Sequence, residues 1–574
     1  MVRQSIKKSN NLLIRSPAPR LRPVWEECRL ARKEKAYLET RPDSETLFSQ
    51  IHTWDRQCRE HRSCFHRPEK LPPRVIDIGE VGGGRNPCLI ETNGQKGHYL
   101  ALSYRWGATA TIRTTRENLA AHREAIPLSK IPRTMQDAIT VARRLGKRYI
   151  WIDALCILQD SQSDWELHAA QMHRIFANAW LVISADAAKD SMSGFLKPRN
   201  ALEIASCQHP SLFEDEAGLP NKAVCPRIPH AQYAVNYSEL SSRGWVLQER
   251  LLARRIVHWG KYEVYWECRE LDASERQPSK CVPLTERTPS TYADFRELRK
   301  AVQPDVRFAA YGKRGIKVRK TITHINQYIS REKNECWYRI VEEYSKRTLT
   351  QPQDRLPAIS GLASAVRSHS KPRAKYVAGL WAEDLPHALL WRRVGGSPLQ
   401  ADRATADLSP DTFIAPSFSW AACPSSVVFC PVSSKAVKYC TQVLAYGTTP
   451  RGNDELGKLV GGWIKLRGLT IPLDTLHVEC PAASRPSSPG SGLFMDEPDD
   501  CNDLRGRDIV VLSVRNGRRS AGTADSGPFS RHACLLLVPT ADSDVYRRVG
   551  YYEPEPFLYR AGTRKWQTHT LTII

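Results

Sequence analysis

Apolar residues follow two different repeats along the chain. After Pro132 they recur every three or four positions, at Met135, Ala138, Ile139, Ala142 and Leu145. This spacing predicts an amphipathic helix, with Thr134 placed to cap its start and Gly146 to end it. The next residues, Tyr149–Ile152, form a near-continuous apolar run of strand length, which is typical of a strand covered on both faces.

The alternation continues beyond this run. Asp164 is placed to cap a second helix, whose apolar stripe consists of Met172, Ile175, Phe176 and Ala179. A strand-like run follows this helix at Leu181–Ile183. Three more come before the first helix, at Val75–Ile78, Leu89–Glu91 and Tyr99–Ser103. Strands and helices in this order predict an α/β fold, in which a parallel sheet is covered by helices on its faces.

The remaining regions lack this regular alternation and suggest domain boundaries. Residues 1–50 mix Pro, Ser and basic side chains, which is typical of a flexible tail. We expect strands and turns over 51–98, an α/β core over 99–270, and a basic insertion with a helix over 271–350. An additional α+β region with many short strands is expected over 351–574, with a disordered Pro/Ser/Gly-rich loop near 481–500.

Composition agrees with a folded chain that stays inside the cell. Of its 574 residues, 41% are hydrophobic and 25% charged, as in ordinary globular proteins. The longest apolar run, Tyr149–Leu158, is too short to cross a bilayer, and the N-terminus lacks the apolar core of a secretory signal. The 16 cysteines form no disulfide pattern. We expect an intracellular, cytoplasmic protein, with the nucleus as the alternative.

The formal charge of +23 makes anionic partners electrostatically plausible. Basic residues concentrate in 1–35 and in 307–333. The second stretch has the composition of a nuclear import signal or a nucleic-acid patch, and equally that of a solvated insertion loop. Charge alone therefore leaves nucleic acid as an alternative partner.

Residues that directly follow the predicted strands carry the first group of candidate functional side chains. Ligands of open parallel sheets bind beyond the carboxyl ends of the strands. Tyr104–Gly107, Asp153 and Ser184–Asp186 all follow such ends. Aromatic rings can stack on a base while Arg105 meets a phosphate, so this edge suits a nucleotide-like ligand. The structural alternatives are a turn closed by Trp106 and Gly107 and a helix capped by Asp153.

A second group lies between Arg243 and Arg250. Glu249 stands beside Arg250 and near Arg243, so it is either a general acid/base or part of a buried ion pair. The upstream segment Cys58-x-x-His61-x-x-Cys64-x-His66 offers four residues that zinc accepts. Four ligands within nine residues would strain a tetrahedral site, so we assign no metal to them. Metalloprotease, α/β-hydrolase and protein-kinase signatures are absent from the sequence.

Several multi-residue segments follow one another in a characteristic order: Tyr99–Gly107, Ile131–Thr134, Tyr149–Asp160, positions within Asp164–Ala179, Ser193–Phe195, Arg243–Arg250 and Tyr265–Cys268. Taken together, they resemble the HET domain of fungal heterokaryon-incompatibility proteins. Flanking segments extend the resemblance over about 54–422. It implies non-self recognition, in which fusion of genetically different hyphae triggers cell death.

The resemblance also implies a distant similarity to TIR domains, and so a flavodoxin-like core. Some TIR domains cleave NAD with a helix glutamate, which makes NAD a candidate substrate here. Where the family often has this glutamate, the chain has His168. Glu166 lies about 200° around the helix and points to the opposite face. A catalytically silent module that acts by protein association is therefore the alternative to an NAD-cleaving enzyme.

These considerations give one set of candidate residues. Candidate catalytic residues are Glu249, Asp153 and His168. Candidate ligand-binding residues are Tyr104, Arg105, Trp106, Gly107, Gln159, Arg243, Trp245, Gln248 and Arg250. Expected partners are other incompatibility or signalling proteins, or a second copy of the chain.

Overall fold

The structure is a computed structural model of the chain. It describes residues 38–65, 67–80, 85–108, 112–200, 204, 207–214, 220–225, 229, 231–279, 295–302, 335–368, 374–394, 413–430, 437–452, 454–476, 493–496, 508–517, 532–554 and 566–574. The chain divides into two compact units. The first comprises Met1–Cys156, Ala179–Leu240 and Arg254–Tyr292, and the second comprises Ile157–Asn178, Ser241–Ala253 and Ala293–Ile574.

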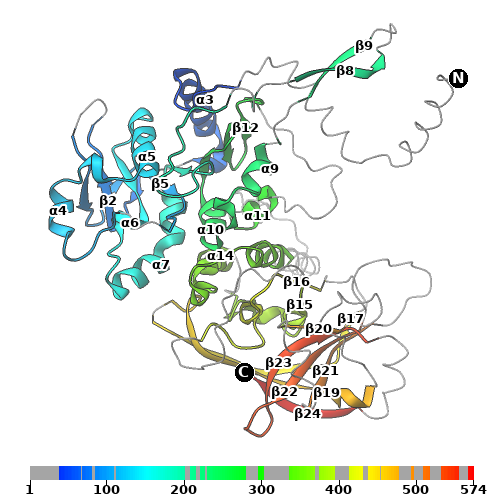
Figure 1. The fold of residues 1–574 in the computed structure, drawn as a ribbon. Coiled ribbons are helices and arrows are strands. Elements are labelled where there is room, and N and C mark those ends of the chain that lie inside the picture. Colours follow the sequence, from blue (N-terminus) through cyan, green and yellow to red (C-terminus); the bar gives the residue numbers. More distant parts are fainter. Residues whose placement is uncertain are drawn as a thin grey trace, which may run out of the picture. The chain divides into compact units, whose positions relative to one another are not determined.

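An eight-stranded mixed sheet forms the centre of the first unit (Figure 1). Its strands are β2 (Arg74–Asp77), β3 (Cys88–Glu91), β5 (Tyr99–Ser103), β6 (Tyr149–Trp151), β7 (Leu181–Ser184), β10 (Arg255–Trp259), β11 (Val264–Cys268) and β12 (Asp272–Ser274). Their order across the sheet is β12-β11-β10-β7-β5-β6-β2-β3. The four middle strands are parallel, and antiparallel pairs close both sides.

The predicted α/β class is confirmed, but the sheet is mixed and only its four middle strands are parallel. Strand β5 lies between β6 and β7, with Ala101 opposite Trp151 on one side and Val182 on the other. The side chains of β5 and β7 are all buried. Strand β6, the run predicted to be covered on both faces, buries Ile150 and Trp151 and leaves Tyr149 half-buried. The helices of this unit are α3 (Glu45–Glu60), α4 (Leu119–Glu124), α5 (Arg133–Arg144), α6 (Asp153–Cys156) and α9 (Ala231–Asn236), with 3-10 turns η1 (Arg62–Cys64) and η2 (Leu128–Lys130).

Helix α5 confirms the predicted amphipathic helix but not its cap. It buries Met135, Ala138, Ile139 and Ala142. Thr134 lies inside the helix, and its hydroxyl donates to the Asp190 carbonyl and accepts the Gly194 N–H. The residue before the helix is Pro132, which gives no side-chain cap. Thr134 therefore fastens the loop at 190–194 instead of the helix end.

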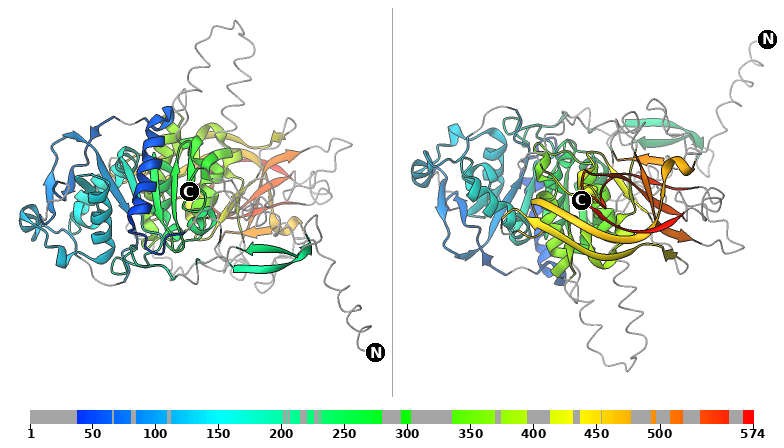
Figure 2. Two further views of the ribbon diagram at one scale, coloured as in Figure 1. Left: turned by 90° about the horizontal axis from the view of Figure 1, so that it is seen from above. Right: turned by 90° about the horizontal axis from the view of Figure 1, so that it is seen from below.

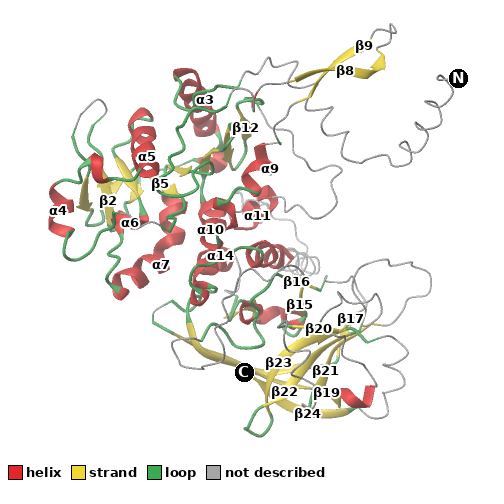
Figure 3. Cartoon of the chain, viewed as in Figure 1, coloured by secondary structure: helices red, strands yellow, loops and turns green. Residues whose placement is uncertain are grey.

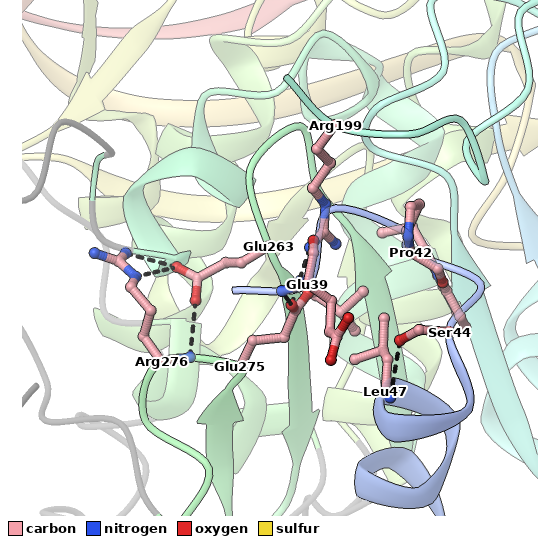
Figure 4. Close-up of polar contacts among 10 residues, drawn as sticks. Glu39, Pro42, Ser44, Leu47, Arg199, Glu263, Glu275 and Arg276 are labelled. Carbon is pink, nitrogen blue, oxygen red and sulfur yellow. Dashed lines mark hydrogen bonds and ion pairs between the residues drawn. The ribbon is translucent and has the colours of Figure 1, made fainter. Parts of the chain in front are cut away.

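Helix α3 begins at Glu45, inside the range expected to be a flexible tail. The Ser44 hydroxyl caps it by accepting the Leu47 N–H. The helix lies against β11 (dark blue in Figure 2), where the Trp54 ring is 6.3 Å from that of Trp266. Glu39, which precedes this helix, is also held by contacts. Arg199 donates to the Glu39 carbonyl and forms a buried ion pair with Glu275 (Figure 4).

Two small ladders complete the first unit. Strands β1 (Glu69–Lys70) and β4 (Lys96–Gly97) pair with each other, as do β8 (Cys207–Glu214) and β9 (Pro220–Cys225). Both pairs are antiparallel.

Helices form the first layer of the second unit (red in Figure 3). They are α7 (Gln162–Asn178), α10 (Gly244–Leu252), α11 (Phe295–Val302), a helix over 335–345, and α14 (Pro357–Ser368). The helix over 335–345 buries Trp337, Ile340, Val341 and Tyr344. Helix α7 begins two residues before Asp164, and the Ser161 hydroxyl accepts the Asp164 N–H. Asp164 instead accepts the Leu158 N–H with its carboxylate.

Short elements connect these helices to the rest of the second unit. They are the strands β13 (Tyr376–Val377), β14 (Leu380–Trp381), β15 (Trp391–Arg393) and β16 (Val427–Phe429), with 3-10 turns η3 (Leu240–Ser242, which begins in the first unit), η6 (Pro352–Asp354), η7 (Ala382–Asp384), η8 (His387–Leu389) and η9 (Trp420–Ala422).

The C-terminal part of this unit closes into a five-stranded barrel. Its strands are β19 (Leu459–Pro472), β21 (Val510–Gly517), β22 (Ala533–Pro539), β23 (Val545–Tyr552) and β24 (Gln567–Ile573), with β17 (Val437–Tyr439), β18 (Gln442–Pro450), β20 (Leu493–Met495) and turn η10 (Leu473–Leu476) attached. Pairing of β21 with β19 closes the ring. Along β19, buried Ile464 and Leu466 alternate with exposed Lys465 and Arg467, which fits a filled barrel.

The region over 351–574 was expected to be α+β and rich in short strands. It also contains this barrel, whose strand β19 alone has 14 residues. Residues 481–500 were expected to form a disordered loop, but strand β20 falls within them. It pairs with β23 and buries Leu493 and Met495. The rest of that loop, the basic stretches at 1–35 and 307–333, and His66 lie outside the described residues, wholly or for their greater part.

Candidate functional site

Residues after β5 form a compact polar edge in the first unit. The Trp106 indole N–H donates to the Asp153 carboxylate at 2.8 Å. Arg105 pairs with Glu239, and their side chains are 33% and 61% exposed. Tyr104 is buried, so its ring belongs to the core instead of offering a stacking surface. Arg105, Trp106 and Asp153 are each partly exposed.

Gly107 allows the chain to leave this edge. Its φ of +81° lies in the left-handed region that favours glycine. A Cβ built there would stand 2.5 Å from the Asp190 Cβ. Asp153 also has a local role, because its second carboxylate oxygen accepts the Ala154 N–H at the start of α6. The geometry is therefore compatible with the structural alternatives for these residues, a turn that includes Gly107 and a helix capped by Asp153.

A buried charged network lies at the ends of β7 and β10. The His258 Nδ1 is 2.8 Å from the Asp186 carboxylate, and its Nε2 is 3.4 Å from that of Glu267. Asp186 also accepts the hydroxyls of Ser184 and Ser238. We refer to these five residues as the His258 network.

Burial and charge oppose each other within the His258 network. Burial lowers the pKa of His258, but the carboxylates of Asp186 and Glu267 outweigh it and raise this pKa above its ordinary value. Burial raises the pKa of Asp186, whereas the charge and hydrogen bond of His258 lower it overall. The network therefore favours the charged forms of both His258 and Asp186.

Two of the remaining candidates lie near helix α7 in the second unit. The Gln159 side-chain amide donates to the Ile157 carbonyl at 3.1 Å. His168 is fully buried, with Nδ1 2.8 Å from the Asp164 carbonyl and 3.5 Å from its carboxylate. This burial means that His168 presents no surface to solvent.

Helix α10 carries four more candidates, and Arg243 precedes it. Trp245 donates its indole N–H to the Asp354 carboxylate at 3.3 Å. Gln248 and Glu249 are buried, and Arg250 places its guanidinium 4.1 Å from the centre of the Phe295 ring. Arg243 forms a single parallel bridge with Thr348.

The polar atoms of α10 lie among other buried groups. Burial, followed by the charge of Arg250, lowers the pKa of Arg347 to about 10, and the Glu249 charge opposes this. Glu249 thus lies among buried charged side chains. Gln248 differs: within the described residues, neither amide atom of its side chain has a hydrogen-bond partner.

The candidates therefore form two groups. Tyr104–Gly107 and Asp153 come together in the first unit, whereas Gln159, His168 and the candidates from Arg243 to Arg250 belong to the second. Sequence reasoning noted Asp186 at a strand end but missed His258, which lies inside an apolar strand. The one feature of the sequence that could have pointed to His258 is a polar residue within an apolar strand.

A second missed group involves cysteine. The side chains of Cys58, His61, Cys64 and Cys268 place one potential metal-ligand atom each within 4.8 Å of one another. The sequence pointed to the first three, but it gave no reason to join them to Cys268 on β11. We refer to these four residues as the Cys3His cluster.

Comparison with known proteins connects these features. Residues 99–249 match the family described as Heterokaryon incompatibility protein (HET). The chain carries a HET domain. No curated protein and no solved structure matches the chain.

The HET domain contains the polar edge after β5, His168, and the candidates up to Glu249. It also contains part of the His258 network, namely Ser184, Asp186 and Ser238, while His258 and Glu267 lie beyond it. In the part of the chain that the structure describes, no helix has the length and apolar character needed to span a bilayer.

Proposed function

We propose that this protein acts in non-self recognition and regulated cell death, and that the edge after β5 of its HET domain binds a nucleotide-like ligand such as NAD. A HET domain indicates a function related to heterokaryon incompatibility in fungi. The observation that carries the ligand proposal is the strand order around β5. In chain order the four parallel strands are arranged 2-1-3-4, as in flavodoxin-like sheets, which a TIR-like core would share.

This order directs attention to one point of the sheet. From β5 the chain goes first to β6 on one side and later to β7 on the other. Doubly wound sheets bind ligands at such a switch point, beyond the carboxyl ends of the strands. Arg105 and Trp106 follow β5, and Asp153 follows β6, at this point.

The chemistry of these side chains suits an anion with an aromatic ring. The Arg105 guanidinium is one-third exposed and is held by the more exposed Glu239, so a phosphate can replace that carboxylate. Trp106 is oriented by its hydrogen bond to Asp153 and offers a ring for stacking. The ion pair of Arg105 also explains how the cation is kept in place before a ligand arrives.

Calorimetric titration of the full chain with NAD, ADP-ribose and ATP tests this proposal. Arg105→Ala should weaken binding by about 10- to 100-fold, because a hydrogen bond to a charged group contributes about 1.5–3 kcal/mol. Arg123→Ala is the matched control, since Arg123 also forms a half-exposed ion pair, with Glu91. Its affinity should stay within about twofold of wild type. Equal affinities in both variants, or no binding of any of the three compounds, would contradict the proposal.

A second candidate function is a catalytically silent association module. Burial of His168 at the position of the family's glutamate favours it, because a group without solvent exposure has no access to a substrate. Glu249 is likewise buried. NAD turnover by wild type, His168→Glu, Glu249→Ala and Asp153→Asn distinguishes the two functions. Loss of turnover in Glu249→Ala or Asp153→Asn would indicate an enzyme, whereas turnover in none of the four proteins would favour association.

A further inference from the structure

The Cys3His cluster has the chemical composition and the spacing of a metal centre. Cys58, Cys64 and Cys268 are buried, and His61 is half-buried. A tetrahedral zinc ion with Zn–S bonds of about 2.3 Å requires sulfur atoms about 3.8 Å apart. The Cys268 Sγ lies 3.5 Å from the His61 Nδ1, and all four ligand atoms lie within 4.8 Å of one another. The side chains are therefore already gathered around one point.

The local backbone explains how three ligands reach this point from one short segment. Cys58 lies in the last turn of α3, His61 ends the helix, and Cys64 ends the 3-10 turn η1. The His61 N–H donates to the Cys58 carbonyl, and the Cys64 N–H donates to the His61 carbonyl. In such turns residues three apart project to the same side. The spacing of three thus places all three side chains on one face.

The fourth ligand resolves the strain that argued against a zinc site in the sequence. Structural zinc sites usually take ligands from separated segments. Cys268 ends strand β11, 207 residues after His61, and approaches the other three ligands from the sheet. With Cys268 as the fourth ligand, the zinc site does not require His66.

Hydrogen bonds around the cluster hold its ligands in orientation. The Leu271 N–H donates to the Cys268 Sγ at 3.2 Å. Arg255 donates to the Cys64 carbonyl, and Arg269 donates to the Ser63 carbonyl. The Ser63 hydroxyl and N–H both donate to the Glu270 carboxylate. Surrounding hydrogen bonds of this kind are typical of metal ligands.

Charge around the cluster gives an independent indication. The Arg255 side chain is 1% exposed, and its nearest carboxylate contact, to Asp55, is long at 3.8 Å. Within the described residues, its Nε and Nη1 have no hydrogen-bond partner. Its other partners are the Cys64 carbonyl and the Trp180 ring, whose centre is 4.3 Å from the guanidinium. A buried cation without a close anion is costly. Three thiolates around one Zn²⁺ carry a net charge of −1 and would offset it.

We propose that Cys58, His61, Cys64 and Cys268 bind one structural zinc ion that joins the end of α3 to strand β11. Four protein ligands leave no open coordination position, so the site is structural and not catalytic. Binding releases the thiol protons of the three cysteines, and no electron transfer is involved. A disulfide is the chemical competitor, but it would join two sulfurs and leave the third cysteine and His61 without a function.

Metal analysis of the full chain tests the proposal. Protein expressed without a histidine tag and dialysed against metal-free buffer should contain about one zinc per chain. Cys64→Ser and Cys268→Ser should lower the zinc content by about tenfold or more. The matched control is Cys88→Ser, because Cys88 is also a buried thiol of the first unit but lies outside the cluster. This variant should retain the zinc of wild type.

Substitution by cobalt keeps the test decisive if the serine variants fail to fold. Wild type loaded with Co²⁺ should show thiolate-to-cobalt charge-transfer absorption and the visible bands of a tetrahedral site with three sulfurs and one nitrogen. His61→Cys keeps four ligands, so it should still bind zinc, and its cobalt spectrum should change to that of four sulfurs. Wild type without zinc after reconstitution, a disulfide within the cluster, or a cobalt spectrum unaltered in His61→Cys would overturn the proposal.

Discussion

Replacing Asp186 with asparagine should destabilise the first unit in a pH-dependent manner. The Asp186 and His258 side chains are 3% and 2% exposed and meet at 2.8 Å. Removing one partner of a buried ion pair generally costs about 3–5 kcal/mol. We expect about 3 kcal/mol at about pH 6, at the lower end of this range, because an imidazolium can release its proton.

The sign of the pH dependence follows from the direction of each pKa shift. The folded pKa of His258 is raised above 6.5, so its contribution to stability is complete below about pH 6.5 and is lost as pH rises through the folded pKa. The folded pKa of Asp186 is lowered below 3.8, so its contribution is present above pH 3.8 and is lost as pH falls through the folded pKa. Both contributions coexist between these limits. Well above the folded pKa of His258, Asp186→Asn should cost only about 1 kcal/mol, the value of a neutral hydrogen bond.

Urea unfolding at about pH 6 and about pH 9 measures this difference. Hydrogen-exchange mass spectrometry of peptides from β7 and β10 assigns the transition to the first unit. Asp43→Asn is the control, because Asp43 pairs with the exposed Arg41 and should change the unfolding free energy by less than about 0.5 kcal/mol. A loss for Asp186→Asn that is equal at both pH values, or below about 1 kcal/mol at the lower pH, would refute the ion-pair reasoning.

Two further substitutions test packing in each unit. Gly107→Ala should lower the unfolding free energy by about 2 kcal/mol more than Gly94→Ala. Both glycines have a positive φ, but of the two only Gly107 lacks room for a Cβ. Thermal unfolding of both variants measures the difference, and equal losses would contradict the predicted clash. Arg548→Ala should cost about 3–5 kcal/mol in urea unfolding, since it leaves the Asp496 carboxylate buried without its partner. The exposed neighbour Arg547 is its control, and a loss in Arg547→Ala as large as that in Arg548→Ala would contradict the role of the buried pair.

Elements with strong local periodicity could be predicted from the sequence. Strand β5 has the predicted bounds Tyr99–Ser103, and α5 buries the predicted stripe except for Leu145, which follows the helix. Both follow from apolar spacing, which depends on neighbours within one element. Helix caps were less predictable, because the hydroxyl of Thr134 bonds to a loop 56 residues away instead of its own helix.

The candidate site could be predicted only in part. The strand ends pointed to Arg105, Trp106 and Asp153, and the hydrogen bond between Trp106 and Asp153 brings two of them together. Burial was not visible in the sequence, so Tyr104 and His168 received roles that need exposed groups. Their surroundings come from packing against distant segments.

Local patterning in the sequence by itself determined the α/β class, the parallel strands and the three-residue spacing of Cys58, His61 and Cys64. Tertiary structure alone decided that Cys268 completes that cluster, that His258 faces Asp186, and that β21 pairs with β19 to close the barrel. Each of these contacts joins segments far apart in the chain. The physical reason is that apolar periodicity specifies which face of an element is buried, whereas the partner of that face depends on the packing of the whole unit.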